Sequence, residues 1–163
     1  MIAADVQVRR AVCADADLLA PRLRHADARE IEAVTSLSHA AALAAGVGAS
    51  RPCYTIVTQG DHPIGLFGVQ PAGRSIGTVW LLGSEELVES PLLFLRKSRR
   101  WLARLHQSCA TLRAVADARN EVHLRWLAWC GFAHHRALPS YGRQRLPFYE
   151  MISSRQSNDR LRR

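Results

Sequence analysis

The sequence predicts an α+β domain in which helices pack against a sheet. Three observations indicate this class: a short strand pattern opens the chain, β-rich segments follow one another between residues 53 and 82, and helical patterns alternate with strands after residue 90. The chain has 163 residues, 48% of them hydrophobic, which suffices for one core without disulfides or a metal. We therefore expect one domain over residues 1–152 and a basic, mobile tail at 153–163.

The N-terminal third predicts one strand and three short helices. Val6 and Val8 alternate with polar neighbours, as in a strand with one buried face. Capping residues open the helices, and Gly46 and Gly48 are expected to end the last one. The predicted helices begin at Asp15 or Asp17 with Leu18, Leu19 and Leu23 inward and end near Arg24, begin at Asp27 with Ile31 and Val34 inward, and run from Ser38 to Ala45.

The middle of the chain predicts three consecutive antiparallel strands. Residues 53–58 and 63–69 are rich in β-branched and aromatic side chains, and the turn between them contains Gly60. A second turn, rich in glycine and proline, precedes a third strand at 78–82. These segments form a meander.

The C-terminal part alternates helices with strands. A long helix begins with Ser90 as its cap and Pro91 in its first turn. A strand at 112–116 stops at Asp117, and a helix capped by Asn120 follows and ends at Gly131. A final strand pair, 132–137 and 148–152, is expected around a loop at 139–147.

Composition excludes several classes of protein. No apolar run is long enough for a signal peptide or a membrane span, so we expect neither export nor a membrane partner. The four cysteines are far apart and are expected to be free thiols. His106, His134 and His135 have no further ligand at suitable spacing, so no metal site is expected.

Charge is unevenly distributed along the chain. Residues 1–90 contain seven basic and ten acidic side chains, whereas residues 91–163 contain fifteen basic and four acidic ones. This asymmetry favours an acidic protein surface as partner, with nucleic acid as the less favoured alternative. The expected contact residues lie on the long helix and are Arg96, Lys97, Arg99, Arg100 and Arg104.

The segment Asn120–Phe132, following a strand, resembles a motif of the GNAT acetyltransferases, in which an Asn precedes a helix that ends in Gly-Phe. The resemblance extends over residues 5–152 and implies a mixed, mostly antiparallel sheet flanked by helices on both faces. It also implies that acetyl-CoA would bind at Asn120 and at the backbone of Leu81, Leu82 and Gly83. Asp117, or a water, would then accept the proton of the amine.

Two departures from this family argue against a working site. The loop that should bind the pyrophosphate of coenzyme A has one glycine, three carboxylates (Glu85, Glu86 and Glu89) and a proline, Pro91, without an N–H. Leu127 stands where many members have a tyrosine that protonates the leaving thiolate. We therefore expect no cofactor in preference to acetyl-CoA.

Each polar candidate near this motif also has a purely structural interpretation. Asn120 can serve as a helix cap alone or as a cap and a ligand together. For His123, a buried and hydrogen-bonded side chain is favoured over a general base. For Asp117, pairing with Arg119 or Arg113 is favoured over catalysis.

A narrower pattern, from Asn120 through His123, Arg125 and Trp126 to Gly131, is similar to GNAT-related proteins of short-tailed bacteriophages, including an internal virion protein. That resemblance implies a role in virion assembly, with phage structural proteins as partners, in the cytoplasm of an infected bacterium or in the virion. The alternative is an active N-acetyltransferase that acts on a host protein or a small amine.

Overall fold

The computed structural model describes residues 6–89 and 91–156, the side chains of residues 91–95 excepted. The described strands form one sheet in the order β1-β2-β3-β4-β5-β7-β6. The strands are β1 (Gln7–Arg10), β2 (Cys53–Thr58), β3 (His62–Gly73), β4 (Ile76–Gly83), β5 (Thr111–Asp117), β6 (Ala133–Tyr141) and β7 (Leu146–Ser154). The helices are α1 (Cys13–Leu19), a 3₁₀ turn (Ala20–Arg22), α2 (His25–Val34), α3 (His39–Ala49), α4 (Glu86–Glu89), α5 (Pro91–Leu105) and α6 (Glu121–Trp129).

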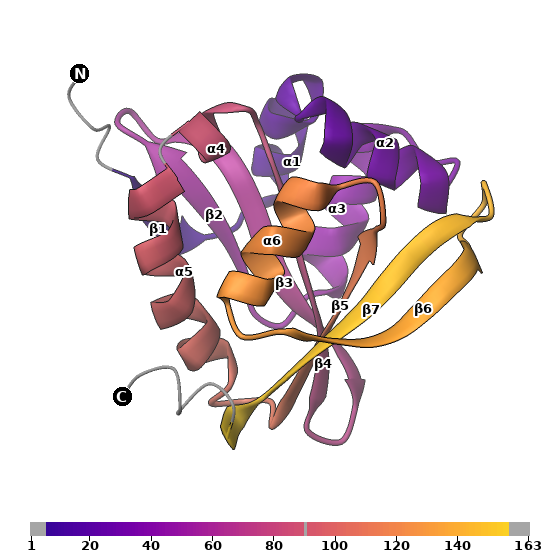
Figure 1. Ribbon diagram of the computed structural model, residues 1–163. Helices are drawn as coiled ribbons and strands as arrows, with labels where there is room; N and C mark the ends of the chain where they lie inside the picture. The colour runs from indigo at the N-terminus through magenta and orange to yellow at the C-terminus, as the bar shows by residue number, and fades with distance from the viewer. Residues whose placement is uncertain (1–5, 90, 157–163) are drawn as a thin grey trace.

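Helices cover both faces of the sheet, and each face has its own core (Figure 1). The larger core lies beneath α5 and α6 and contains Phe67, Leu102 and Leu127. The smaller core lies beneath α1 and α3 and contains Leu19 and Leu43, both fully buried. The α+β class, with a mixed and mostly antiparallel sheet between two helical layers, is confirmed.

The meander and its hairpins agree with the sequence. β2, β3 and β4 pair antiparallel in succession, as the alternating pattern and intervening turns predict. β4 and β5 are the parallel pair, with α4 and α5 as the crossover between them. β5 and β7 pair antiparallel over Thr111–Asp117, so β5 is fully paired on one side only.

The start of α1 differs from the sequence prediction. Val12 is the N-terminal cap, so neither Asp15 nor Asp17 opens the helix. Asp15 instead turns back within the first turn, where its carboxylate accepts from the Val12 N–H at 2.9 Å. Leu19 is buried as expected, but Leu18 is 53% exposed because it lies on the opposite side of the helix.

α1 ends at Leu19, before the predicted end near Arg24, whereas the next two helices extend beyond their predicted bounds. α2 begins at His25, so Asp27 lies inside its first turn and not at its cap, and Val34 at its end is exposed. α3 begins after the Ser38 cap as predicted but continues through Gly46 and Gly48 to Ala49. Packing of Gly46 against Trp80 accounts for a glycine inside the helix, since a Cβ there would lie 2.9 Å from the indole ring.

The C-terminal hairpin replaces the loop expected at 139–147. β6 continues to Tyr141, and the turn at Gly142 docks on the end of α2, where the Arg143 and Gln144 N–H groups donate to α2 carbonyls. β7 continues to Ser154, two residues beyond the expected end of the domain. Residues 157–163 lie outside the described residues, so mobility of the tail stays a prediction.

Candidate functional site

β4 and β5 separate to form a fork at the centre of the sheet. Among the described residues their pairing consists of Ile76 to Thr78 against Thr111 to Arg113. Beyond these pairs, residues 79–83 of β4 and 114–117 of β5 diverge, and we call the space between them the β4–β5 fork. Backbone groups facing such a gap need other partners, because buried N–H and C=O groups are costly to leave unpaired.

Asp27 of α2 accepts a hydrogen bond from the backbone at the end of β4. The Gly83 N–H donates to Asp27 Oδ2 at 2.9 Å, and the Gly83 carbonyl accepts from the Arg24 N–H at 2.8 Å. The Arg24 guanidinium donates to Asp27 Oδ1 at 2.8 Å, and both side chains are buried, with 9% and 5% of their surface exposed. The two backbone groups of Gly83 that face the fork are therefore held by the start of α2.

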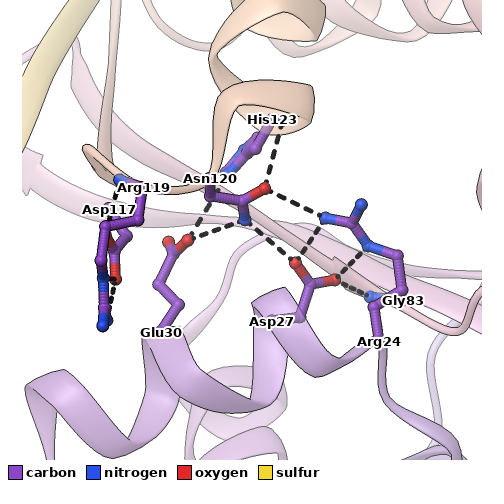
Figure 2. A network of polar contacts seen from close by, with 8 residues as sticks. All are labelled: Arg24, Asp27, Glu30, Gly83, Asp117, Arg119, Asn120 and His123. Carbon is purple, nitrogen blue, oxygen red and sulfur yellow. Dashed lines mark hydrogen bonds and ion pairs between the residues drawn. The ribbon is translucent and has the colours of Figure 1, made fainter.

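Asn120 joins this ion pair to α6 (Figure 2). Its Nδ2 donates to Asp27 Oδ1 at 3.3 Å and to Glu30 Oε2 at 3.2 Å. Its Oδ1 accepts from the His123 N–H at 3.3 Å, which confirms the predicted helix cap, and from Arg24 at 3.4 Å. Asn120 therefore uses both of its amide hydrogens and its oxygen inside the protein.

His123 faces Glu30 beneath the first turn of α6, with 3.7 Å between Nδ1 and Oε2. Burial lowers the pKa of His123, but the carboxylates of Glu30 and Asp27 outweigh burial, and the net result is a pKa above the ordinary value. A raised pKa means that His123 binds its proton more firmly than a free imidazole, so this arrangement favours the structural interpretation over a general base.

Asp117 lies at the end of β5 and is paired with Arg119. The Arg119 side chain donates to both carboxylate oxygens, at 2.6 Å from Nη2 and 3.0 Å from Nε. Burial raises the pKa of Asp117, but the bonds from Arg119 outweigh it and hold the pKa below its usual range. This carboxylate is a weaker base than an unpaired one, and its catalytic role stays a prediction.

The stretch expected to bind the cofactor runs into a short helix. Leu87 of α4 packs on the end of β4, where a Cβ at Gly83 would lie 2.4 Å from the Leu87 Cδ2. A cavity of about 30 Å³ lies at the Gly83 end of the fork and is lined by Arg24, Asp27, Leu81, Leu87, Val88, Val122, His123 and Trp126. That volume holds about one water molecule.

The acidic turn after β4 lies beside cations that the sequence alone does not place there. Glu86 pairs with Arg22. Burial lowers the pKa of the Arg24 guanidinium, but Asp27 and, to a smaller extent, Glu85 raise it above the ordinary value. Glu85 and Glu86 are thus partly compensated. Pro91 begins α5 as predicted, whereas the Ser90 cap lies outside the described residues.

Two contacts join α5 to α6, and we call them the α5–α6 clasp. The Trp126 indole N–H donates to Ser98 Oγ at 3.0 Å. The Arg99 guanidinium donates to the Trp129 carbonyl at 3.1 Å and lies 3.9 Å from the centre of the Trp129 ring. These contacts hold the two helices together over the face of the sheet that contains the fork.

The basic side chains of α5 differ in their surroundings. Lys97 is half-buried and donates to the Val6 carbonyl at 2.5 Å, and Arg99 belongs to the clasp. Arg104 is exposed and lies 5.3 Å from the Trp101 ring, and Arg96 and Arg100 are also exposed. The five residues therefore do not form one uniformly solvated surface.

Several network residues were not singled out by sequence analysis. Arg24, Asp27 and Glu30 are spaced three apart, which places them on one face of a helix. That spacing was a usable signal, although Asp27 was interpreted only as a cap. Among the described residues no group of His, Cys, Asp and Glu could hold a metal ion, and no helix is long and apolar enough to cross a membrane.

No protein-family model and no curated protein matches the chain. Solved structures do match it. An aminoglycoside acetyltransferase in complex with ribostamycin and coenzyme A has a TM-score of 0.71 at 15% identity, with 97% of this chain and 98% of that one covered. A GNAT-family acetyltransferase from Bacillus anthracis has 0.70 at 10% identity, covering 94% and 97%.

A spermidine N-acetyltransferase from Vibrio cholerae has a TM-score of 0.69 at 10% identity, with 97% and 98% of the two chains covered. These structures give no support to the narrower resemblance to phage proteins. At such identities the likeness concerns the arrangement of helices and strands and not the chemistry of the site. The chain has the GNAT fold over nearly its whole length.

Proposed function

We propose that this chain is a GNAT-fold binding protein in which an internal polar network replaces the acetyl-CoA site. The observation that carries the proposal is the bond from the Gly83 N–H to Asp27. An acyl carbonyl bound to β4 would need a backbone donor of this kind, and here a side chain of the same protein takes it.

Acetyl-CoA does not fit the residues present in the fork. A cavity of about 30 Å³ cannot admit a pantetheine arm, and Leu87 covers the glycine at the end of β4. The turn that would meet the pyrophosphate contains Glu85, Glu86 and Glu89, and a phosphate there would lie beside like charges. The α5–α6 clasp also closes this face of the sheet.

Calorimetric titration with acetyl-CoA tests the proposal directly. We expect no heat of binding at millimolar ligand, with a GNAT enzyme of known affinity as the positive control. Asp27→Asn is the matched variant, because it keeps the shape of the side chain and we expect it to gain no binding. Micromolar affinity in the wild-type chain would overturn the proposal.

The competing function is an active N-acetyltransferase, which the coenzyme A complex among the similar structures favours. In that case Asn120 and the backbone of Leu81, Leu82 and Gly83 contact the cofactor, and Asp117 accepts the proton. Micromolar acetyl-CoA binding that Asn120→Ala weakens by tenfold or more, with the fold intact by circular dichroism, would support this function.

For the partner, we propose an acidic protein surface that binds the exposed arginines of α5. The support is the excess of basic side chains after residue 90 and the exposure of Arg96 and Arg100. We expect fluorescence anisotropy to show salt-sensitive binding of labelled polyglutamate that Arg96→Glu/Arg100→Glu abolishes, with Arg74→Glu as the control. Tighter binding of duplex DNA than of polyglutamate would favour nucleic acid instead.

The phage setting rests on the residue pattern from Asn120 to Gly131 alone. For this role we expect the chain to co-purify with assembled virus particles and to be detected in them by mass spectrometry. Its absence from purified particles would remove the virion role and would leave the binding proposal standing.

A further inference from the structure

We propose that the space beneath α5 is a binding site for a small, uncharged, apolar molecule about the size of one aromatic ring. This site goes beyond the proposed function and does not depend on it. The cavity has a volume of about 150 Å³ and lies between α5 and strands β1 to β4. Its described lining is mostly apolar and includes Val8, Ile56, Phe67, Val79, Trp101 and Leu105.

The cavity is distinct from the β4–β5 fork. Its described lining reaches β1 and β2 at one edge of the sheet, whereas the cavity at the Gly83 end of the fork is lined from α2, α4, α6 and Leu81 of β4. The two spaces share Leu81, Leu87 and Trp126, which stand between them. A molecule beneath α5 would therefore contact this dividing wall without entering the fork.

Contacts at two places fix α5 over the sheet. Lys97 donates to the Val6 carbonyl, and the adjacent Ser98 accepts from Trp126 of α6. One turn further on, the Trp101 ring packs against Tyr54, with 4.8 Å between ring centres. These contacts bound the cavity along the helix.

The lining decides what can occupy this space. Three polar lining residues already bind other protein groups: Lys97 contacts Val6, Ser98 contacts Trp126, and Glu86 contacts Arg22. Thr58 and Glu89 also line the space, so an anionic occupant would lose its hydration beside carboxylates. A buried water needs two to four polar partners. Apolar cavities of about 150 Å³ lined by Leu, Ile and Phe stay dry and bind benzene.

Titration with benzene tests the site, with benzoate as the charged counterpart. We expect saturable benzene-dependent shifts in the amide NMR spectrum at residues of α5 and β3, and none with benzoate. Val8→Phe fills the cavity from the edge strand and is expected to weaken benzene binding at least tenfold. Val115→Phe is the control, because Val115 lies on β5 and outside the cavity lining, and it should leave binding unchanged.

Tryptophan fluorescence decides the matter if Val8→Phe does not fold. Trp80, Trp101 and Trp126 line the cavity, so Trp101→Phe should reduce a benzene-dependent change in emission that Trp129→Phe retains in full. The proposal is overturned if benzene gives no saturable change, if it binds Val8→Phe as tightly as the wild type, or if benzoate binds equally well. Displacement of benzene by acetyl-CoA would place it in the fork and would also overturn the separate site.

Discussion

The β4–β5 fork and the cavity beneath α5 lie on two sides of one wall, yet one is closed and the other is open. The fork contains Asp27, Arg24 and Asn120, whose hydrogen bonds draw α2, β4 and α6 together and leave about 30 Å³. The cavity is apolar and retains about 150 Å³. Hydrogen bonds fix the distances between the polar groups at the fork, whereas no such directional contact spans the apolar cavity.

The largest expected effect is the loss of the buried carboxylate in the fork. Asp27→Ala leaves the buried Arg24 charge and the Gly83 N–H without their partner and should lower the free energy of unfolding by about 3–5 kcal/mol. Urea unfolding measures this, with the exposed Asp17→Ala as a control that should change it by less than about 0.5 kcal/mol. An equal effect of the two substitutions would contradict the network's role.

The next effect concerns the wall between the two spaces. Leu87→Ala should lower the free energy of unfolding by about 2–5 kcal/mol, because it removes buried methyl groups and enlarges a space that is already empty. Leu18→Ala is the matched control, since Leu18 is 53% exposed and should cost far less. Similar urea unfolding midpoints for Leu87→Ala and Leu18→Ala would mean that the packing of Leu87 between the two spaces does not stabilise the fold.

A smaller effect is expected from the α5–α6 clasp. Trp126→Phe keeps a six-membered aromatic ring but removes the N–H group that donates to Ser98 and part of the indole, and the lost hydrogen bond should cost about 1 kcal/mol. A double-mutant cycle with Ser98→Ala isolates the coupling between the two side chains. Strict additivity in this cycle would show that the hydrogen bond does not hold the helices together.

The smallest expected effect is a pH dependence at His123, because burial opposes the two carboxylates there. The raised folded-state pKa means that the charge on His123 contributes stability below pH 6.5, and this is lost as pH rises through the folded-state value. The wild-type chain should therefore lose more stability on alkalinisation than His123→Gln, measured by urea unfolding. The control is His25→Gln, which changes an exposed histidine. If His123→Gln lost as much stability on alkalinisation as the wild type, that result would argue against the pair of His123 with Glu30.

Sequence analysis was most successful where a local pattern carries its own physical cause. β2 was placed over residues 53–58, Ser38 and Asn120 were placed as caps, and Pro91 as the first residue of α5, because strand alternation, side-chain capping and proline geometry act within a few residues. Sequence analysis predicted that Leu18 and Val34 face inward, but both are exposed. Their exposure depends on which side of the helix meets the sheet.

Part of the candidate site could therefore be predicted from the sequence, and part could not. The acidic turn and Leu127 could be identified as departures from an acetyltransferase, and Asp117 and Arg119 could be paired because they are neighbours in sequence. The ion pair of Glu86 could not be predicted, because Arg22 reaches it only when the first helices cross the end of β4.

The sequence by itself determined the order of elements, the α+β class and the residue types available to the fork, because periodicity and capping are properties of short segments. Only the tertiary structure decided that Asp27 binds Gly83, 56 residues away, and that a cavity lies between α5 and the strands. Such contacts depend on how segments meet in space, and no local pattern encodes the distance between them.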